Sequence, residues 1–124
     1  MVAVIGTTTW GTTLGIVLAR NDVPVCLVAR TKTEADSLDS NRRNLRFLPD
    51  VPLPPSLKIA SDLEEAIAPA GLVILAVPSH RLRQNIRAIR DSLTSGTIFV
   101  SAAKGLELPG GERMSQVLEQ ELPP

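Results

Sequence analysis

VIGTTTWGTT, residues 4–13, is the segment from which the architecture of this chain can be inferred. It joins an apolar run to a segment of helical spacing, and Gly6 and Gly11 occupy the first and last glycine positions of a G-x-G-x-x-G pattern. In such loops the first glycine makes a tight turn, the second lets the backbone approach a pyrophosphate, and the third allows close helix–strand packing. The second position here is Thr8. The loop therefore predicts a modified dinucleotide site, and a plain strand–turn–helix remains the alternative.

The threonines of this loop bear on whether it still holds phosphate. A positive φ at Thr8, as glycine adopts there, would cost about 1–3 kcal/mol and weaken binding. Against this, the hydroxyls of Thr7, Thr8 and Thr9 can donate hydrogen bonds to phosphate oxygens. The N-terminus of the following helix adds unpaired amides and a partial positive charge.

Five short apolar runs along the chain indicate the strands of a sheet. They lack polar alternation, which is typical of parallel strands covered on both faces. Helical patterns separate them, and strict alternation of strand and helix favours a doubly wound parallel sheet of the Rossmann-like α/β class. We expect one domain, residues 1–124. The runs are residues 2–5, 24–29, 57–60, 72–77 and 97–102.

The segment 82–93 has the clearest helical pattern, with apolar residues on one face and arginines on the other. We expect the arginines to be solvated. The apolar residues are Leu82, Ile86, Ile89 and Leu93, and the arginines are Arg83, Arg87 and Arg90.

Helix starts are also predicted from local signals. Thr31 with Glu34, and Ser61 with Glu64, have capping-box spacing. Ser79 is expected to cap the helix that follows it, with a solvent-facing histidine next in sequence. By contrast, residues 47–56 carry four prolines and predict an ordered, extended connection outside helices and central strands.

Composition excludes several classes of function. The 124 residues, 44% of them hydrophobic, include 13 basic and 13 acidic side chains, a balance that argues against nucleic-acid or anionic-membrane binding. No apolar run is long enough to span a membrane, and no signal-peptide pattern is present. The single cysteine, Cys26, lies in an apolar run and predicts a buried thiol in a cytoplasmic protein. One histidine and one cysteine give no metal-ligand cluster, so we expect no metal site.

The end of the second predicted strand indicates which dinucleotide is bound. NAD sites usually place an acid about 20 residues past the loop, where it binds the ribose 2′-hydroxyl. Here the sequence offers Arg30 and Lys32, and no acid before Glu34. Because a guanidinium can pair with a 2′-phosphate, this pattern favours NADP(H) over NAD(H). A solvated charge at a helix start is the alternative.

Lys104 follows the last predicted strand at its carboxyl end, the edge where open α/β sheets bind ligands. A lysine there can neutralise a phosphate or polarise a carbonyl, and Gly105 lets the chain turn beside it. Taken alone, a surface lysine is the alternative.

Four motifs in order carry a resemblance to a known family. VIGTTTWGTTLG matches V-I-G-x-G-x-W-G-T-A-L-A, and NLRFLPDVPLP at residues 44–54 matches N-x-x-Y/F-L-P-G-x-x-L-P. AVPSH at residues 76–80 comes next, and SAAKGLE at residues 101–107 corresponds to S-A-T-K-G-I-E. Together they resemble the N-terminal domain of bacterial NAD(P)-dependent glycerol-3-phosphate dehydrogenases over essentially the whole chain.

The resemblance implies hydride transfer between a nicotinamide cofactor and the pair dihydroxyacetone phosphate and sn-glycerol 3-phosphate, which feeds phospholipid synthesis. It places Thr9 and Trp10 on the pyrophosphate side, Arg30 and Thr31 near the adenosine ribose, and Phe47 where the family usually has tyrosine. Lys104 would reach both nicotinamide and substrate. The cofactor-binding residues we expect are Gly6, Thr8, Thr9, Trp10, Gly11, Arg30, Thr31, Phe47 and Lys104, with Lys104 also substrate-binding.

The family's chains continue with further strands and a helical domain that carries the catalytic lysine. We therefore expect no catalytic residue in this chain, which would be a fragment inactive by itself, with a phosphorylated triose as substrate only if the second domain is supplied. Homo-oligomerisation is a further expectation. One alternative is a non-catalytic Rossmann-type binding or interaction module that has lost tight cofactor binding. A reductase of 6-phosphogluconate or ketopantoate type is disfavoured by the segments RFLP and AAKGLE.

Overall fold

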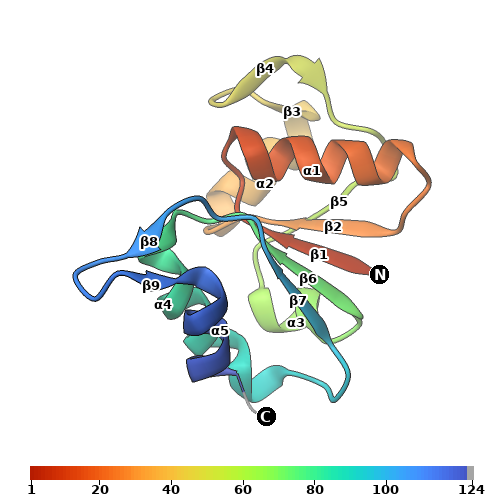
Figure 1. Ribbon diagram of the computed structural model, residues 1–124. Helices are drawn as coiled ribbons and strands as arrows, with labels where there is room; N and C mark the ends of the chain where they lie inside the picture. Colours follow the sequence, from red (N-terminus) through yellow and green to blue (C-terminus); the bar gives the residue numbers. More distant parts are fainter. Residues whose placement is uncertain (123–124) are drawn as a thin grey trace.

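The computed structural model describes residues 1–122 and builds them around one parallel sheet (Figure 1). The strand order is β5-β2-β1-β6-β7, so the chain moves outward from β1 in one direction and then in the other. This order is the doubly wound arrangement predicted from the sequence. The strands are β1 Val2–Ile5, β2 Val25–Val28, β5 Lys58–Ala60, β6 Leu72–Leu75 and β7 Ile98–Ser101.

Helices cover both faces of the sheet because each buried strand has apolar side chains on both sides. On β1, Val2 and Val4 belong to the apolar cluster under α1 and α2, whereas Ala3 and Ile5 belong to the cluster under α3, α4 and α5. Figure 1 shows the two helical layers on opposite sides of the sheet. The helices are α1 Thr9–Arg20, α2 Lys32–Asn41, α3 Leu63–Ile67, α4 Ser79–Ile89 with the 3₁₀ turn η1 Arg90–Ser92, and α5 Met114–Glu121.

Two hairpins outside the main sheet were not predicted. The proline-rich connection is extended, as expected, but β4 (Leu48–Pro52) also pairs antiparallel with β3 (Arg43–Asn44). The second hairpin joins β8 (Leu106–Glu107) to β9 (Glu112–Arg113). Both hairpins lie toward the end of the sheet where its strands finish (Figure 1). The two-residue strands β3, β8 and β9 are too short to carry a period-2 signal in the sequence, and the prolines of β4 argue against a strand there.

β7 departs from the expectation of strands covered on both faces. Phe99 packs against the cluster under α4, but Ile98 and Val100 point to the other face and are 62% and 43% exposed. The helix on that face, α1, packs against β1 and β2 instead. The apolar run predicted the strand correctly but not its position at the edge of the described sheet.

The helix caps follow the sequence only in part. The Thr31 hydroxyl accepts from the Glu34 amide, as predicted. The cap of α3 is Asp62, one residue after the predicted Ser61, and its carboxylate accepts from the Glu65 amide. α4 begins at Ser79 itself, after Pro78 at the cap position. Proline has no side-chain acceptor, and it holds the cap position through its fixed φ alone. The sequence rule for caps looks for a side-chain oxygen and therefore selects Ser79, the next residue.

The face of α4 was also predicted only in part. Leu82, Ile86 and Ile89 are fully buried, as their spacing indicates. Arg83 is not solvated, because α5 packs against α4 there and supplies a carboxylate partner, whereas Arg87 is exposed as expected although it pairs with Glu121. Cys26 is buried as expected, and burial raises the pKa of its thiol while the charge of Lys58 lowers it to a smaller extent. No helix within residues 1–122 is long and apolar enough to cross a membrane.

Candidate dinucleotide-binding site

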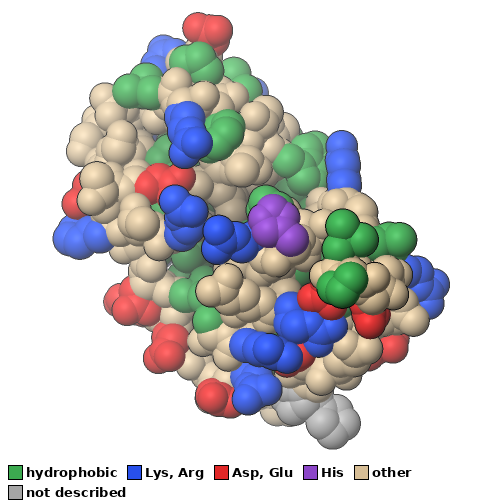
Figure 2. All heavy atoms as spheres, turned by 90° about the vertical axis from the view of Figure 1, so that its left-hand side faces the viewer, with side chains coloured by type: hydrophobic (Ala, Val, Ile, Leu, Met, Phe, Trp, Pro, Cys, Tyr) green, Lys and Arg blue, Asp and Glu red, His purple; other side chains and the backbone are tan. Residues whose placement is uncertain are grey.

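A hollow of about 840 Å³ lies at the carboxyl ends of the central strands. Its walls come from the loop after β1, the start of α2, the β3–β4 hairpin and the first turns of α4. The strand order reverses between β1 and β6, and open α/β sheets bind ligands at this switch point. Figure 2 looks onto this edge and shows several Lys and Arg side chains near the middle of the face.

The two loop glycines are required by backbone contacts. Gly6 has φ +114°, and a Cβ there would lie 2.5 Å from the carbonyl oxygen of Ala76 at the end of β6. A Cβ on Gly11 would overlap the carbonyl oxygen of Gly6. The first glycine therefore makes the turn and the last lets α1 approach it closely, which are the roles expected at these positions.

Thr8 is not strained, contrary to the concern raised by its sequence position. Its φ of −69° and ψ of 178° are ordinary extended values, and it stands at the N-cap of α1. The positive φ of this loop is at Gly6 alone, so the cost of a left-handed threonine does not arise. Thr8 makes no side-chain cap hydrogen bond. Its hydroxyl is thus not used in capping α1 and stands at the wall of the hollow.

The other two threonine hydroxyls have protein partners and are not directed at a ligand. Thr7 is buried and donates from Oγ1 to the carboxylate of Glu34. The second oxygen of Glu34 accepts from the Arg30 amide at 3.1 Å. Thr9 donates to the carbonyl of Phe47 at 3.3 Å. Glu34 therefore ties the end of β2 to the loop after β1, a role that its place in a capping box did not reveal.

Asn44 connects the β3–β4 hairpin to the same loop. Its buried side-chain amide donates to the Thr7 carbonyl at 2.7 Å and to Thr12 Oγ1 at 2.8 Å. Its oxygen accepts from the Phe47 amide at 3.2 Å. These bonds satisfy most of the hydrogen-bonding capacity of the side chain and hold Phe47 beside the hollow. The only signal for this residue in the sequence was its place at the start of the motif at residues 44–54.

The charge around the hollow is predominantly positive. Four of its arginines form no ion pair within residues 1–122, whereas Glu34 is the one carboxylate in the wall. Both oxygens of that carboxylate already accept hydrogen bonds. The guanidinium of Arg46 also lies 4.8 Å from the ring centroid of Phe47, a cation–π distance. The four are Arg30, Arg43, Arg46 and Arg81.

A smaller hollow of about 240 Å³ adjoins the first at Thr8. Trp10 from the start of α1 and Lys104 from the segment after β7 line it. Trp10 is 48% exposed, so its ring is available to a ligand. Gly105, with φ +104°, turns the chain next to Lys104, and a Cβ there would lie 3.4 Å from the Ser79 hydroxyl.

The predicted site residues are thus distributed over two adjoining hollows and the loop behind them. Gly6, Thr8, Arg30, Thr31 and Phe47 line the larger hollow. Thr8, Trp10 and Lys104 line the smaller one. Thr9 and Gly11 line neither, and hold the hairpin and the helix in place instead. His80 is exposed at the larger hollow, and no grouping of metal-ligating side chains occurs in the part of the chain that the structure describes.

Comparison with known proteins gives one consistent family. The sequence profile of the NAD-dependent glycerol-3-phosphate dehydrogenase N-terminus matches residues 1–124. A glycerol-3-phosphate dehydrogenase [NAD(P)+] of Dehalococcoides mccartyi is 48% identical over 124 residues, which are 99% of this chain and 34% of that protein. The corresponding enzyme of Chlorobium limicola is 44% identical over 122 residues, 98% of this chain and 37% of its own length. The chain thus spans about a third of the curated relatives it matches.

Solved structures agree with this assignment. The crystal structure of glycerol-3-phosphate dehydrogenase from Coxiella burnetii superposes with a TM-score of 0.92 at 29% identity, covering 98% of this chain and 37% of that one. The yeast enzyme, at 24% identity and a TM-score of 0.85 over 98% of this chain and 38% of its own, shows the same fold. The chain therefore belongs to the family defined by the N-terminal domain of NAD-dependent glycerol-3-phosphate dehydrogenases.

Proposed function

We propose that this chain binds a nicotinamide dinucleotide across the two hollows and prefers NADP(H) to NAD(H). The observation that carries the preference is the set of arginines around the larger hollow, of which Arg30 stands two residues after the last residue of β2. A 2′-phosphate at this place would meet guanidinium groups that form no ion pair with any carboxylate of residues 1–122. The one acid nearby, Glu34, already accepts from Thr7 and the Arg30 amide, so it has less capacity to bind a ribose hydroxyl.

The backbone around Gly6 fits a pyrophosphate. The N-terminus of the twelve-residue helix α1 follows the turn at once, so its unpaired first amides and partial positive charge lie next to Thr8 at the wall of the hollow. The hydroxyl of Thr8 adds a donor. In this arrangement Lys104 and Trp10 line the hollow that would take the nicotinamide end.

Thermal unfolding with and without dinucleotide tests this proposal. A ligand at 100 times its Kd stabilises the folded state by about 2.7 kcal/mol, which is readily measured. We expect NADPH to raise Tm more than NADH at equal millimolar concentration. If neither dinucleotide shifts Tm, the proposed binding function is wrong.

Arg30→Gln tests the preference separately. Loss of one charge-assisted hydrogen bond of about 1.5–3 kcal/mol lowers NADPH affinity roughly tenfold or more and leaves NADH affinity unchanged. Arg20→Gln is the matched control, since Arg20 is an exposed arginine at the far end of α1. Equal losses for NADPH and NADH would show that Arg30 contacts a part common to both.

For the complete protein we propose hydride transfer between the cofactor and the pair dihydroxyacetone phosphate and sn-glycerol 3-phosphate, the reaction of the family. Lys104 would bind the phosphorylated substrate beside the nicotinamide. Residues 1–124 by themselves would bind cofactor without turnover, because they supply one wall of a closed active site. Turnover of dihydroxyacetone phosphate with NADPH by residues 1–124 alone would contradict this.

A second function, a cofactor-free interaction module, is favoured by one observation. Trp10 and Val17 on α1 are exposed, and so are Ile98 and Val100 on the same side of the sheet at β7. Exposed apolar surfaces of this kind mark interfaces. Sedimentation velocity at increasing concentration separates the two functions. A monomer that binds NADPH excludes the module, whereas self-association without NADPH binding supports it.

A further inference from the structure

Strand β8 of the β8–β9 hairpin is attached to the domain by charge and not by apolar burial. In the two-residue strand β8, Leu106 is 51% exposed, and Leu108 just after it is 82% exposed. The side chain that points inward is Glu107, whose side chain is 16% exposed. Met114, which directly follows β9, is buried and anchors that end of the hairpin at α5. The strand β8 has no such apolar anchor, so the contacts of Glu107 hold it against the helices.

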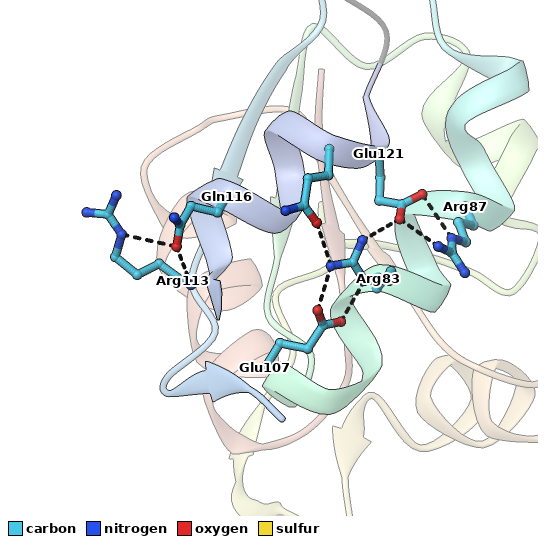
Figure 3. Close-up of polar contacts among 7 residues, drawn as sticks. Arg83, Arg87, Glu107, Arg113, Gln116 and Glu121 are labelled. Atoms are coloured by element: carbon cyan, nitrogen blue, oxygen red, sulfur yellow. Dashed lines mark hydrogen bonds and ion pairs between the residues drawn. The ribbon is translucent and has the colours of Figure 1, made fainter. Parts of the chain in front are cut away.

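Arg83 of α4 holds this glutamate with two parallel hydrogen bonds. Nε donates to one carboxylate oxygen of Glu107 at 2.8 Å, and a terminal nitrogen donates to the other at 2.6 Å. The same guanidinium donates to Glu121 at 2.5 Å and to Gln120 at 2.7 Å, both on α5 (Figure 3). This two-pronged geometry fixes direction as well as distance.

A second arginine completes the network from the other side. Arg87, one turn further along α4, donates to both oxygens of Glu121 at 2.9 and 2.8 Å. The side chain of Glu121 is only 6% exposed, so its charge depends on these partners. Hydrogen bonds from Arg87 and then Arg83 lower the pKa of Glu121 to about 2, and those from Arg83 lower the pKa of Glu107. Figure 3 shows Arg83 between Glu107 from the hairpin and Glu121 from α5, with Arg87 pointing toward Glu121 from the other side.

The attached glutamate lies three residues after Lys104. The segment between them leaves the sheet at Ser101, the end of β7, and turns at Gly105 close to the Ser79 hydroxyl. It is thus fixed at one end by the sheet and at the other by Glu107. Lys104 itself is exposed and makes no hydrogen bond or ion pair within residues 1–122. Its place at the smaller hollow is therefore set by the backbone on either side of it.

We propose that Arg83 and Glu107 are positioning residues, whose ion pair holds the β8–β9 hairpin and so keeps Lys104 at the wall of the smaller hollow. The inference rests on the proposed function for the ligand at that hollow. Arg83 touches neither hollow, so it acts only through Glu107 and the hairpin.

Amide hydrogen exchange tests the position of the hairpin without any ligand. Glu107→Gln keeps the size of the side chain but removes its charge and one of its two acceptors. We expect the amides of residues 104–113 to exchange about tenfold faster, as a locally opened segment does, while β1 and β6 stay protected. Glu119→Gln on the exposed face of α5 is the matched control and should change nothing. Unchanged exchange in residues 104–113 of Glu107→Gln would overturn the proposal.

A double-mutant cycle that combines Glu107→Gln with Lys104→Met tests whether the hairpin affects NADPH binding by positioning Lys104. We expect each single variant to weaken NADPH binding about threefold to fivefold, the scale of one exposed charge contact. The double variant should bind no more weakly than Lys104→Met alone, because a mispositioned lysine and a missing one are equivalent. Additive losses would mean that Glu107 has only a structural role and would overturn the proposal.

Arg83→Lys is a second, more conservative variant that tests the same ion pair if Glu107→Gln does not fold. Lysine keeps the positive charge but cannot make two parallel hydrogen bonds. We therefore expect the same faster exchange in the hairpin as in Glu107→Gln, with a smaller change in Tm than in Glu107→Gln. If the unmodified chain binds no NADPH, the proposed function fails. Hydrogen exchange then still decides whether the ion pair holds the segment of Lys104.

Discussion

Gly11→Ala and Gly15→Ala make the same change one turn apart in the same helix, and the structure predicts opposite outcomes. At Gly11 an added Cβ would overlap the carbonyl oxygen of Gly6 and lie 3.2 Å from the Cβ of Ala76. At Gly15 it would lie 3.4 Å from a terminal methyl of Leu57, an ordinary contact with the flexible end of a side chain. The difference is whether the obstacle is backbone or a movable side chain.

The magnitudes follow from these contacts. Alanine gains up to about 1 kcal/mol over glycine through helix propensity at either position. Overpacking costs about 1–3 kcal/mol, and the upper end applies at Gly11 because the Gly6 carbonyl cannot rotate away. Gly11→Ala is therefore expected to lower the free energy of unfolding by about 2 kcal/mol, which for a domain of this size lowers Tm by roughly 8 °C. Gly15→Ala should leave stability unchanged or raise it by up to about 1 kcal/mol.

Urea unfolding followed by far-ultraviolet circular dichroism measures both variants, with equal m-values as the check that the same surface is exposed. NADPH affinity should also fall in Gly11→Ala, since moving the Gly6 carbonyl displaces the turn that lines the larger hollow. A Gly11→Ala variant within about 0.5 kcal/mol of the unmodified chain would refute the argument that α1 depends on this close approach.

Three further predictions concern the loop, the hairpin and the ion-pair network. Thr8→Gly is expected to weaken NADPH binding because it removes an unstrained hydroxyl donor from the wall of both hollows; tighter binding in calorimetry would show that the branched side chain obstructs the phosphate instead. Asn44→Ala leaves buried hydrogen-bonding groups unsatisfied and should cost about 2–4 kcal/mol in urea unfolding, whereas Asn41→Ala, at an exposed site, should cost under about 1 kcal/mol. The folded pKa of Glu121 is about 2, against an ordinary 4.5, and that of Glu107 is also lowered. The network thus contributes its full stability above pH 4.5 and loses it as the pH falls toward 2, so Glu121→Gln should flatten this part of the stability profile.

The central part of the fold could be predicted because its signals are local in sequence. Four consecutive apolar residues in β1, β2 and β6 indicate strands that are buried on both faces, and the structure buries all of them except Leu72, which is partly exposed. Gly6 and Gly11 predicted a turn and a close helix approach from their spacing alone. The place of Lys104 at the ligand edge followed from the strand before it.

The partners of the polar side chains could not be predicted, because each joins segments that are distant in sequence. Glu34 was recognised as a cap acid, but its contact with Thr7 spans 27 positions. Arg83 was expected to be solvated, because nothing near it in sequence shows that α5 returns, 38 positions later, to place Glu121 against it. A local pattern identifies which face of a helix is polar, but not whether that face meets water or a carboxylate.

The sequence by itself determined the doubly wound sheet, the glycine turn after β1 and the arginine at the end of β2, since strand burial and turn geometry are properties of consecutive residues. Tertiary structure decided how the site is assembled. It showed that Thr8 is unstrained because Gly6 makes the turn, and that Asn44 joins the hairpin to the loop. It also placed the guanidinium of Arg83 on both carboxylate oxygens of Glu107, three residues after Lys104. These features depend on the relative placement of whole elements, which is set by the packing of apolar faces and not by the polar residues that then meet.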